Sequence, residues 1–202
     1  AGFAVDLLDP QPGETIVDLC CAPGGKTAYI AEKMKNKGRV LAVDIVPERL
    51  TRLQEHIKRL DLSIITPIAM DGRRPALSKA ADRVLVDAPC SGLGTLARRV
   101  ELRWRRKESD IKAAARTQAE ILDHAADLVK IGGVLVYSTC TIEPEENQQV
   151  VAGFRECHPE FELDAPSAGP LDKVVDSAGM INTIPSLHGV DGSFAVRLKR
   201  MR

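Results

Sequence analysis

Two cysteines in this chain follow apolar runs of strand length, which makes them candidates for chemistry. Cys90 ends the run "VLVDAPC" and Cys140 ends the run "VLVYSTC". A thiolate is a strong nucleophile, and residues that follow a strand lie at the sheet edge where ligands bind in α/β proteins. We therefore expect these two thiols to be functional. Cys20, Cys21 and Cys157 are instead interpreted as small apolar packing residues.

The spacing of the five cysteines gives no metal-binding pattern. Their number is odd and no C-x-x-C pair occurs, so neither a zinc site nor a redox dithiol is predicted, and we expect no metal. Free thiols are typical of a reducing compartment, which favours the cytosol. A helix that Pro144 could open would bring a positive dipole end close to Cys140 and favour its thiolate.

A glycine-containing segment, "VDLCCAPGGKTAYI", contains the Gly-Lys-Thr that closes a phosphate-binding P-loop. The P-loop pattern also needs a glycine five residues before Gly25, where this chain has Cys20. The segment instead resembles the acid-plus-glycines turn of nucleotide-binding α/β folds, with Asp18 followed by the small residues Cys20, Ala22 and Gly24. Small side chains there allow a ligand to approach the backbone.

Two further acids end the next two predicted strands. Asp44 follows "RVLAV" and can accept hydrogen bonds from both hydroxyls of a ribose. Asp71 follows "SIITPIAM" and could accept from an adenine amino group. Acids at the ends of three successive strands favour a cofactor that contains adenosine.

Strand-like and helix-like patterns alternate along the chain, which predicts an α/β fold with a mostly parallel, doubly wound sheet and helices on both faces. Helices are predicted at 26–34, 47–60 and 110–129, with one more from Pro144, and a long loop is expected over 166–185. The seven predicted strands cover 15–19, 39–44, 63–70, 83–90, 132–140, 161–166 and 192–200.

A 3-2-1-4-5 strand order would bring the functional segments together at one edge of this sheet. The first and fourth strands would then be neighbours, so that the segment from Asp87 to Cys90 faces the loop around Gly24. The fifth strand lies beside the fourth, which brings Cys140 to the same crevice. Two thiols are thus expected to converge where the reactive group of a cofactor would lie.

Composition limits the partners that the chain could have. Its 202 residues suit one domain, and 28 basic residues balance 28 acidic ones, so there is no overall signal for binding a polyanion. Residues 98–107, "RRVELRWRRK", are locally basic and contain the only tryptophan, which favours either a solvated face or a rim that contacts RNA phosphates. No membrane-spanning run or signal peptide is recognised, and a monomer is the default expectation.

Three segments, "DLCCAPGGKT", "VDAPCSGLGT" and "YSTCTIEPEEN", resemble the signature motifs of the Sun family of RNA cytosine-5 methyltransferases, which use S-adenosylmethionine. The resemblance extends to the C-terminal "DGSFAVRLKR", and the start, "LLDPQPGE", is most similar to bacterial members that modify small-subunit ribosomal RNA. It implies a Rossmann-like class I methyltransferase fold and an RNA substrate. Family members usually carry an additional N-terminal RNA-binding region, so residues 1–202 are expected to form a catalytic domain that lacks it.

Two segments depart from the family pattern. Val100-Glu101 stands where a polar residue and proline are common, and Ser193 stands where an aromatic residue is usual. Both departures lie away from the expected chemistry, so they concern the choice of RNA more than the activity.

The resemblance also implies roles for individual residues. Cys140 would attack C6 of cytosine, Cys90 would assist release of the product, Asp87 would bond the polar edge of the pyrimidine, and Lys26 would help to orient the base. Residues expected at the cofactor are Cys20, Ala22, Pro23, Gly24, Gly25, Lys26, Asp44, Asp71 and Asp87.

Two alternatives remain at this point. An amino-group methyltransferase of the same fold typically ends its fourth strand in an Asp/Asn-Pro-Pro-aromatic segment, whereas this chain has Asp87-Ala88-Pro89-Cys90. A non-catalytic domain that binds the cofactor or RNA is the other alternative, and only a test for methyl transfer separates it from an enzyme.

Overall fold

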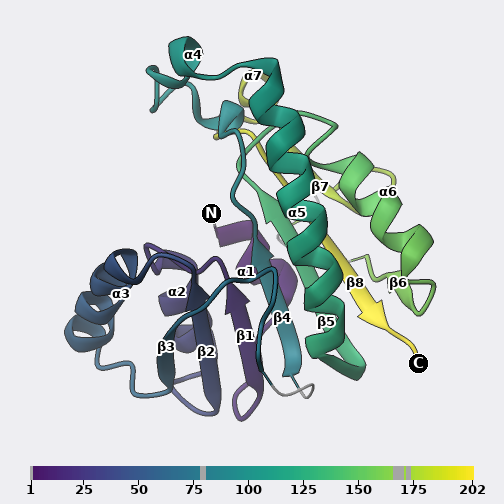
Figure 1. Cartoon of the computed structure of the whole chain (residues 1–202). Helices are drawn as coiled ribbons and strands as arrows, with labels where there is room; N and C mark the ends of the chain where they lie inside the picture. The colour runs from purple at the N-terminus through teal and green to yellow at the C-terminus, as the bar shows by residue number, and fades with distance from the viewer. Residues whose placement is uncertain (1, 78–80, 166–170, 172–173) are drawn as a thin grey trace.

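The fold is built on one eight-stranded sheet with the order β3-β2-β1-β4-β5-β8-β6, in which β7 pairs with β8 (Figure 1). The structure, a computed structural model, describes residues 2–77, 81–165, 171 and 174–202. The first five strands are parallel to their neighbours, whereas β8 runs antiparallel to β5, β6 and β7. The strands are β1 Thr15–Leu19, β2 Arg39–Asp44, β3 Ile65–Ala69, β4 Ala81–Asp87, β5 Val129–Thr139, β6 Phe161–Leu163, β7 Ile181–Thr183 and β8 Ser193–Arg200.

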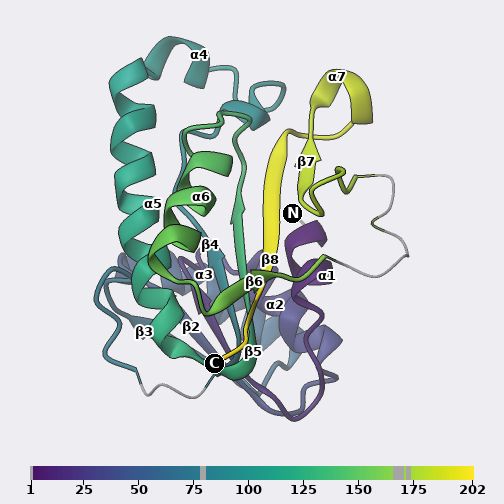
Figure 2. The ribbon, with the colours of Figure 1, turned by 90° about the vertical axis from the view of Figure 1, so that its right-hand side faces the viewer.

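Helices cover both faces of the sheet, as Figure 2 shows with α5 and α6 on one side and α1 and α2 on the other. Successive residues of a strand point to opposite faces, so Ile16 packs with α1, α2 and α3 while Val17 packs with α5 and α6. The helices are α1 Gly2–Leu8, α2 Gly25–Lys33, α3 Pro47–Leu60, α4 Leu102–Arg105, α5 Glu108–Leu128, α6 Gln148–Cys157 and α7 Pro185–His188, with a 3-10 turn at Leu93–Thr95.

The predicted doubly wound sheet and its 3-2-1-4-5 order are confirmed, and all seven predicted strands form. The structure also contains elements that were not predicted: α1, the 3-10 turn at Leu93–Thr95, α4, β7 and α7. Helix α1 lies at the start of the chain, and β7 forms inside the segment 166–185 that was expected to be a loop; residues 166–170 and 172–173 of that segment lie outside the described residues. Among the described residues, no helix combines the length and the apolar character that crossing a bilayer requires.

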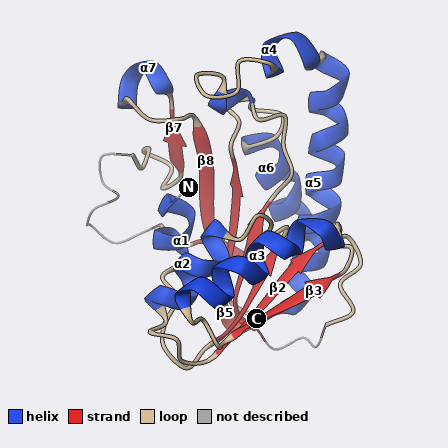
Figure 3. Ribbon diagram, turned by 90° about the vertical axis from the view of Figure 1, so that its left-hand side faces the viewer, coloured by secondary structure: helices blue, strands red, loops and turns tan. Residues whose placement is uncertain are grey.

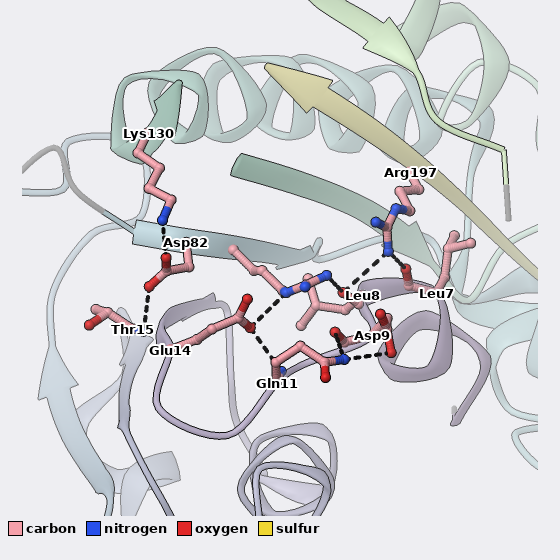
Figure 4. Close-up of polar contacts among 10 residues, drawn as sticks. Leu7, Leu8, Asp9, Gln11, Glu14, Thr15, Asp82, Lys130 and Arg197 are labelled. Carbon is pink, nitrogen blue, oxygen red and sulfur yellow. Dashed lines mark hydrogen bonds and ion pairs between the residues drawn. The ribbon is translucent and has the colours of Figure 1, made fainter. Parts of the chain in front are cut away.

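Two arginines fix the C-terminal end of α1 (Figure 4). The last carbonyls of a helix lack partners within it. Here Arg83 Nη1 donates to the Leu8 carbonyl at 2.6 Å, and Arg197 Nη1 donates to the Leu7 carbonyl at 2.9 Å. Arg83 also pairs with Glu14 at 2.7 Å, so α1 is tied both to the sheet and to the turn before β1.

Candidate active site

Cys90 and Cys140 meet at the carboxyl ends of two neighbouring strands. Cys90 follows β4 and Cys140 follows β5, and the two strands are paired in parallel with Asp87 opposite Ser138. Their Sγ atoms are 3.0 Å apart, and the Cys140 amide donates to Cys90 Sγ at 3.3 Å. Cys140 is exposed and Cys90 is half-buried. The predicted convergence of the two thiols is confirmed, and Cys140 is the one that a substrate can reach.

The contact between the thiols makes Cys140 the more acidic of the pair. A hydrogen bond from Cys90 favours the Cys140 thiolate and, with the charge of Lys26, lowers the pKa of Cys140 to about 7. The pKa of Cys90 is raised, because its proton is held in that hydrogen bond and because its thiol is buried. The expected helix dipole beside Cys140 is wrong: α6 begins at Gln148, and residues 144–147 form turns.

Lys26 and Asp87 face the same space as Cys140. Lys26 Nζ lies 2.5 Å from Asp87 Oδ2, and Ser138 Oγ donates to Asp87 Oδ1 at 2.8 Å. Burial disfavours the charged ammonium of Lys26, but the carboxylate of Asp87 more than offsets this, so the pKa of Lys26 is raised. The pair therefore presents one fixed cation and one fixed anion beside the exposed thiol.

A cavity of about 400 Å³ brings these groups together, lined by Lys26, Asp87 and Cys140. Its other walls come from the start of α1, from the segment after β4 that contains Arg98, and from residues 190–195 at the start of β8. Ser193 was expected to lie away from the chemistry, but it lines this cavity, so that expectation is wrong. The same end of the sheet carries α4 and α7 (Figure 3). This size suits a flat heterocycle of a few hundred cubic ångströms or less.

A buried polar network holds the two cysteine loops in place, and the sequence did not reveal it. Glu146 is fully buried, and its Oε2 accepts from the Ser91 amide at 2.9 Å and from Gln118 Nε2 at 2.8 Å. Asn147 accepts from Thr139 Oγ1 at 2.6 Å. Glu146 and Asn147 therefore point inward instead of opening a helix, which explains why α6 starts later than Pro144 predicts.

A second cavity of about 230 Å³ lies over the loop that joins β1 to α2, and Ala22, Pro23, Gly25, Lys26 and Asp87 are among the residues that line it. Small side chains allow this close approach to the backbone.

The same loop needs glycine at position 24. Gly24 has φ 103°, and a Cβ there would lie 2.7 Å from Leu53 Cδ1 and 3.1 Å from Leu53 Cα. The loop can therefore pass close to α3 only without a side chain at this position.

Asp44 lies beside the loop that joins β1 to α2, where it already accepts hydrogen bonds from backbone amides. It is buried, and its two carboxylate oxygens accept from the amides of Ala22 at 3.1 Å and Val46 at 3.0 Å. Asp44 thereby closes the loop onto the end of β2, and contact with a ribose stays a prediction. Asp71 follows β3 as expected and pairs with Arg73 at 2.8 Å, so a contact with adenine also stays a prediction.

Asp18 lies fully buried below the same loop. Its Oδ2 accepts from Thr27 Oγ1 at 2.6 Å, while its Oδ1 has no hydrogen-bond partner among the described residues. Burial is the main cause that raises the pKa of Asp18 to about 7, and the nearby carboxylates of Asp87 and Asp44 add to it. A buried acceptor without a partner is typical of a site that a ligand or an ordered water completes.

The remaining cysteines divide. Cys21 is buried in the core beside α2 and Cys20 is half-buried, in agreement with a packing role for both, whereas Cys157 is exposed at the end of α6, so the packing interpretation is wrong for it. Trp104 is 83% exposed, which excludes a role in the core of the chain.

Comparisons with known proteins agree on one family. A family model described as 16S rRNA methyltransferase RsmB/F matches residues 5–199. The ribosomal RNA small subunit methyltransferase B of Yersinia pseudotuberculosis serotype O:1b (strain IP 31758) is 49% identical over 162 residues, which cover 79% of this chain and 37% of that protein. The chain thus spans little more than a third of the length of this relative.

Two solved structures share the fold along almost the whole chain. The crystal structure of PH0851 matches with a TM-score of 0.92 and 42% identity over 98% of this chain and 45% of that one. The crystal structure of NSun6 from Pyrococcus horikoshii with SFG matches with a TM-score of 0.86 and 34% identity over 98% of this chain and 51% of that one.

Proposed function

The chain belongs to the RsmB/F family of 16S rRNA methyltransferases, and on that premise we propose that it transfers a methyl group from S-adenosylmethionine to C5 of a cytosine in RNA, with 16S rRNA as the substrate. The single observation that carries this proposal is the pair of thiols 3.0 Å apart, with Cys140 exposed in a cavity beside Lys26 and Asp87. Methylation of an amino nitrogen needs no nucleophilic thiol, so this arrangement favours C5.

The residues of the loop after β1 fit the cofactor. Gly24 lets that loop approach α3, small residues line the adjoining cavity, and Asp18 leaves a buried acceptor unsatisfied within the described residues. We propose that Cys20, Ala22, Pro23, Gly24, Gly25 and Lys26 hold it, together with Asp44, Asp71 and Asp87. When bound, S-adenosylmethionine supplies an electrophilic methyl group on a sulfonium.

Cys140 is proposed to act on the base first. Its thiolate adds to C6, and the electron pair of the C5–C6 double bond moves to C5, which becomes nucleophilic enough to take the methyl group. Asp87 holds the polar edge of the ring, and the ammonium of Lys26 stabilises charge that develops there. Loss of the C5 proton then re-forms the double bond and expels the thiolate, and Cys90 is proposed to assist this step. Because a Cys90–Cys140 disulfide would remove the nucleophile, we expect the protein to act in a reducing compartment such as the cytosol.

Methyl transfer to isolated RNA tests the proposal. The protein is incubated with methyl-labelled S-adenosylmethionine and with total RNA that lacks the modification, and the RNA is then digested to nucleosides. We expect the label in 5-methylcytidine. Label in a nucleoside methylated on an exocyclic nitrogen would replace the proposal with the amino-group reaction, and cofactor binding without any label would favour the non-catalytic alternative.

A further inference from the structure

Residues 98–107, here called the basic arm, project beyond the carboxyl edge of the sheet and carry an aromatic ring into solvent. The arm includes α4, which Figure 1 shows far from the body of the sheet. Leu102 is buried and anchors the arm next to Gly92, whereas Trp104 is 83% exposed. An indole held in water on an anchored turn contributes nothing to the core, so its role lies in contact with a partner.

The charges around Trp104 favour an anionic partner. The arm contains six basic residues and one acid. Arg98 pairs with Asp191 at 3.2 Å and Arg99 pairs with Glu101 at 3.4 Å. Arg103 and Arg105, which flank the tryptophan in sequence, are exposed and form no ion pair within the described residues. Two unneutralised guanidinium groups beside an open indole match a phosphate chain with accessible bases.

The arm is also joined to the thiol site. Arg98 lines the cavity that contains Cys140, and Arg106 Nε donates to the Ser91 carbonyl at 2.8 Å, directly after Cys90. A polymer that places one residue in the cavity therefore has a neighbouring residue within reach of the arm.

We propose that Trp104 stacks on an unpaired base that flanks the target nucleotide, while Arg103 and Arg105 contact the adjoining phosphates. The inference rests on the proposed function only in taking RNA as the polymer. A duplex hides the faces of its bases, so the surface is specific for single-stranded RNA. The cavity itself would hold the target base, and the arm sets which neighbouring segment of the strand must be unpaired.

Tryptophan fluorescence tests the contact directly, because Trp104 is the only tryptophan in the chain. The protein without cofactor is titrated with a single-stranded RNA oligonucleotide, and then with the same sequence annealed to its complement. We expect the single strand to quench the emission and to protect Trp104 from acrylamide, and the duplex to do neither at the same concentration. RNA binding that leaves the emission unchanged would overturn the proposal. So would an emission that shifts with protein concentration alone, which indicates a second copy on this surface.

Variants then measure the contribution to affinity by anisotropy of a labelled oligonucleotide. Trp104→Ala should weaken binding at least about fivefold and Trp104→Phe by less, since a phenyl ring still stacks. Replacing both Arg103 and Arg105 with Ala should reduce the salt dependence, log K against log salt, by about 1.4. Arg39→Ala is the matched control, because Arg39 is exposed at the amino end of β2, away from the site.

Wild-type affinity in Trp104→Ala would refute the stacking role. The titrations need no turnover, so a failure of methyl transfer to C5 would leave this result intact, and the absence of stacking would leave the proposed chemistry intact.

Discussion

The two thiols differ in burial and acidity, and this difference supports the different tasks proposed for them. Cys140 is exposed with a lowered pKa, as a nucleophile requires, while Cys90 is half-buried and keeps its proton. A nucleophile is needed to form the covalent adduct with RNA, whereas a group that assists release is needed only to resolve it.

Replacing each cysteine separately tests this assignment. Cys140→Ala should form neither adduct nor product. Cys90→Ala should form the adduct, methylate the base and remain attached to its RNA, which appears as a slowly migrating band on a denaturing gel. If Cys90→Ala formed no adduct while Cys140→Ala accumulated one, the two roles would be reversed. Normal turnover by both variants would exclude a thiol nucleophile altogether.

The hydrogen bond from Cys90 should also set the pH dependence of adduct formation. Only the Cys140 thiolate reacts, so the rate of the first turnover should rise with pH and level off above about 7. In Cys90→Ala the thiolate loses its hydrogen-bond donor, so the midpoint of this profile should move to higher pH. Rates of adduct formation between pH 5.5 and 9 measure it, and identical midpoints in the two proteins would contradict the role given to Cys90.

Asp18 should make the protein less stable as pH rises, whereas an ion-paired carboxylate makes a protein less stable as pH falls. Its pKa is raised from 3.8 to about 7, so between these values the folded protein keeps a proton that the unfolded chain releases. Its contribution to stability is therefore full below about pH 4 and is lost as pH rises through 7.

Asp18→Asn should remove this dependence, because an amide does not ionise and can still accept from Thr27. The fall in the free energy of unfolding between pH 4.5 and 8 should be smaller in the variant by about 3 kcal/mol, measured by urea denaturation at both pH values. Asp61→Asn, at an exposed left-handed position that asparagine tolerates, is the control. Equal slopes for Asp18→Asn and the wild type would mean that Asp18 is ionised throughout.

At the scale of elements, backbone hydrogen bonds of Gly94 join the loop after β4 to the loop after β5 and to the loop before β8. The Gly94 amide donates to the Cys140 carbonyl at 3.1 Å, and the Gly192 amide donates to the Gly94 carbonyl at 2.8 Å. A Cβ on Gly94 would lie 2.1 Å from the Gly192 oxygen, so the backbones could not keep this distance. The second glycine of "SGLGT", Gly94, thus has a steric cause beside the thiol.

Gly94→Ala should therefore destabilise the protein by about 1–3 kcal/mol and slow adduct formation by displacing Cys140. Gly153→Ala is the matched control, because nothing lies within 4 Å of its added Cβ and alanine favours the helix α6. Thermal unfolding and first-turnover rates compare the two variants. If Gly94→Ala were as stable as the wild type, the loop before β8 could move away from the added Cβ at little cost, and the prediction would be wrong.

Local sequence patterns predicted the regular elements well and the loops poorly. The helix 47–60 and the strands 15–19 and 39–44 have the predicted bounds, because an amphipathic period and buried apolar runs depend on neighbouring residues alone. The positions of Lys26, Asp87, Cys90 and Cys140 at one edge followed from the strand order. The helix expected from Pro144 starts later because the carboxylate of Glu146 binds Ser91 and Gln118, which are distant in sequence.

At the scale of the whole molecule, α1 links two strands that are distant in sequence to the site. Its last carbonyls are bound from β4 and β8, and its first residues line both cavities. The helix packs with α2 and α3 on one face of the sheet, and the donors to its last carbonyls are Arg83 from β4 and Arg197 from β8. The walls of the proposed site therefore depend on interactions at the opposite end of a short helix.

Of the two arginines, Arg83 gives the stronger test of this arrangement. Its side chain is only 12% exposed, and it donates to both the Glu14 carboxylate and the Leu8 carbonyl. Arg83→Met preserves the length and apolar stem of the side chain but leaves the Leu8 carbonyl and the Glu14 carboxylate without this donor. We expect a loss of about 2–3 kcal/mol in the free energy of unfolding, as for buried hydrogen bonds to a charged group. Lys112→Met, which breaks an exposed pair with Glu108 on α5, should change stability little. Denaturant unfolding compares the two variants, and amide exchange in α1 locates the effect. If Arg83→Met unfolded like Lys112→Met, with the amides of α1 still protected from exchange, the hydrogen bonds of Arg83 would not be what holds α1 against the sheet.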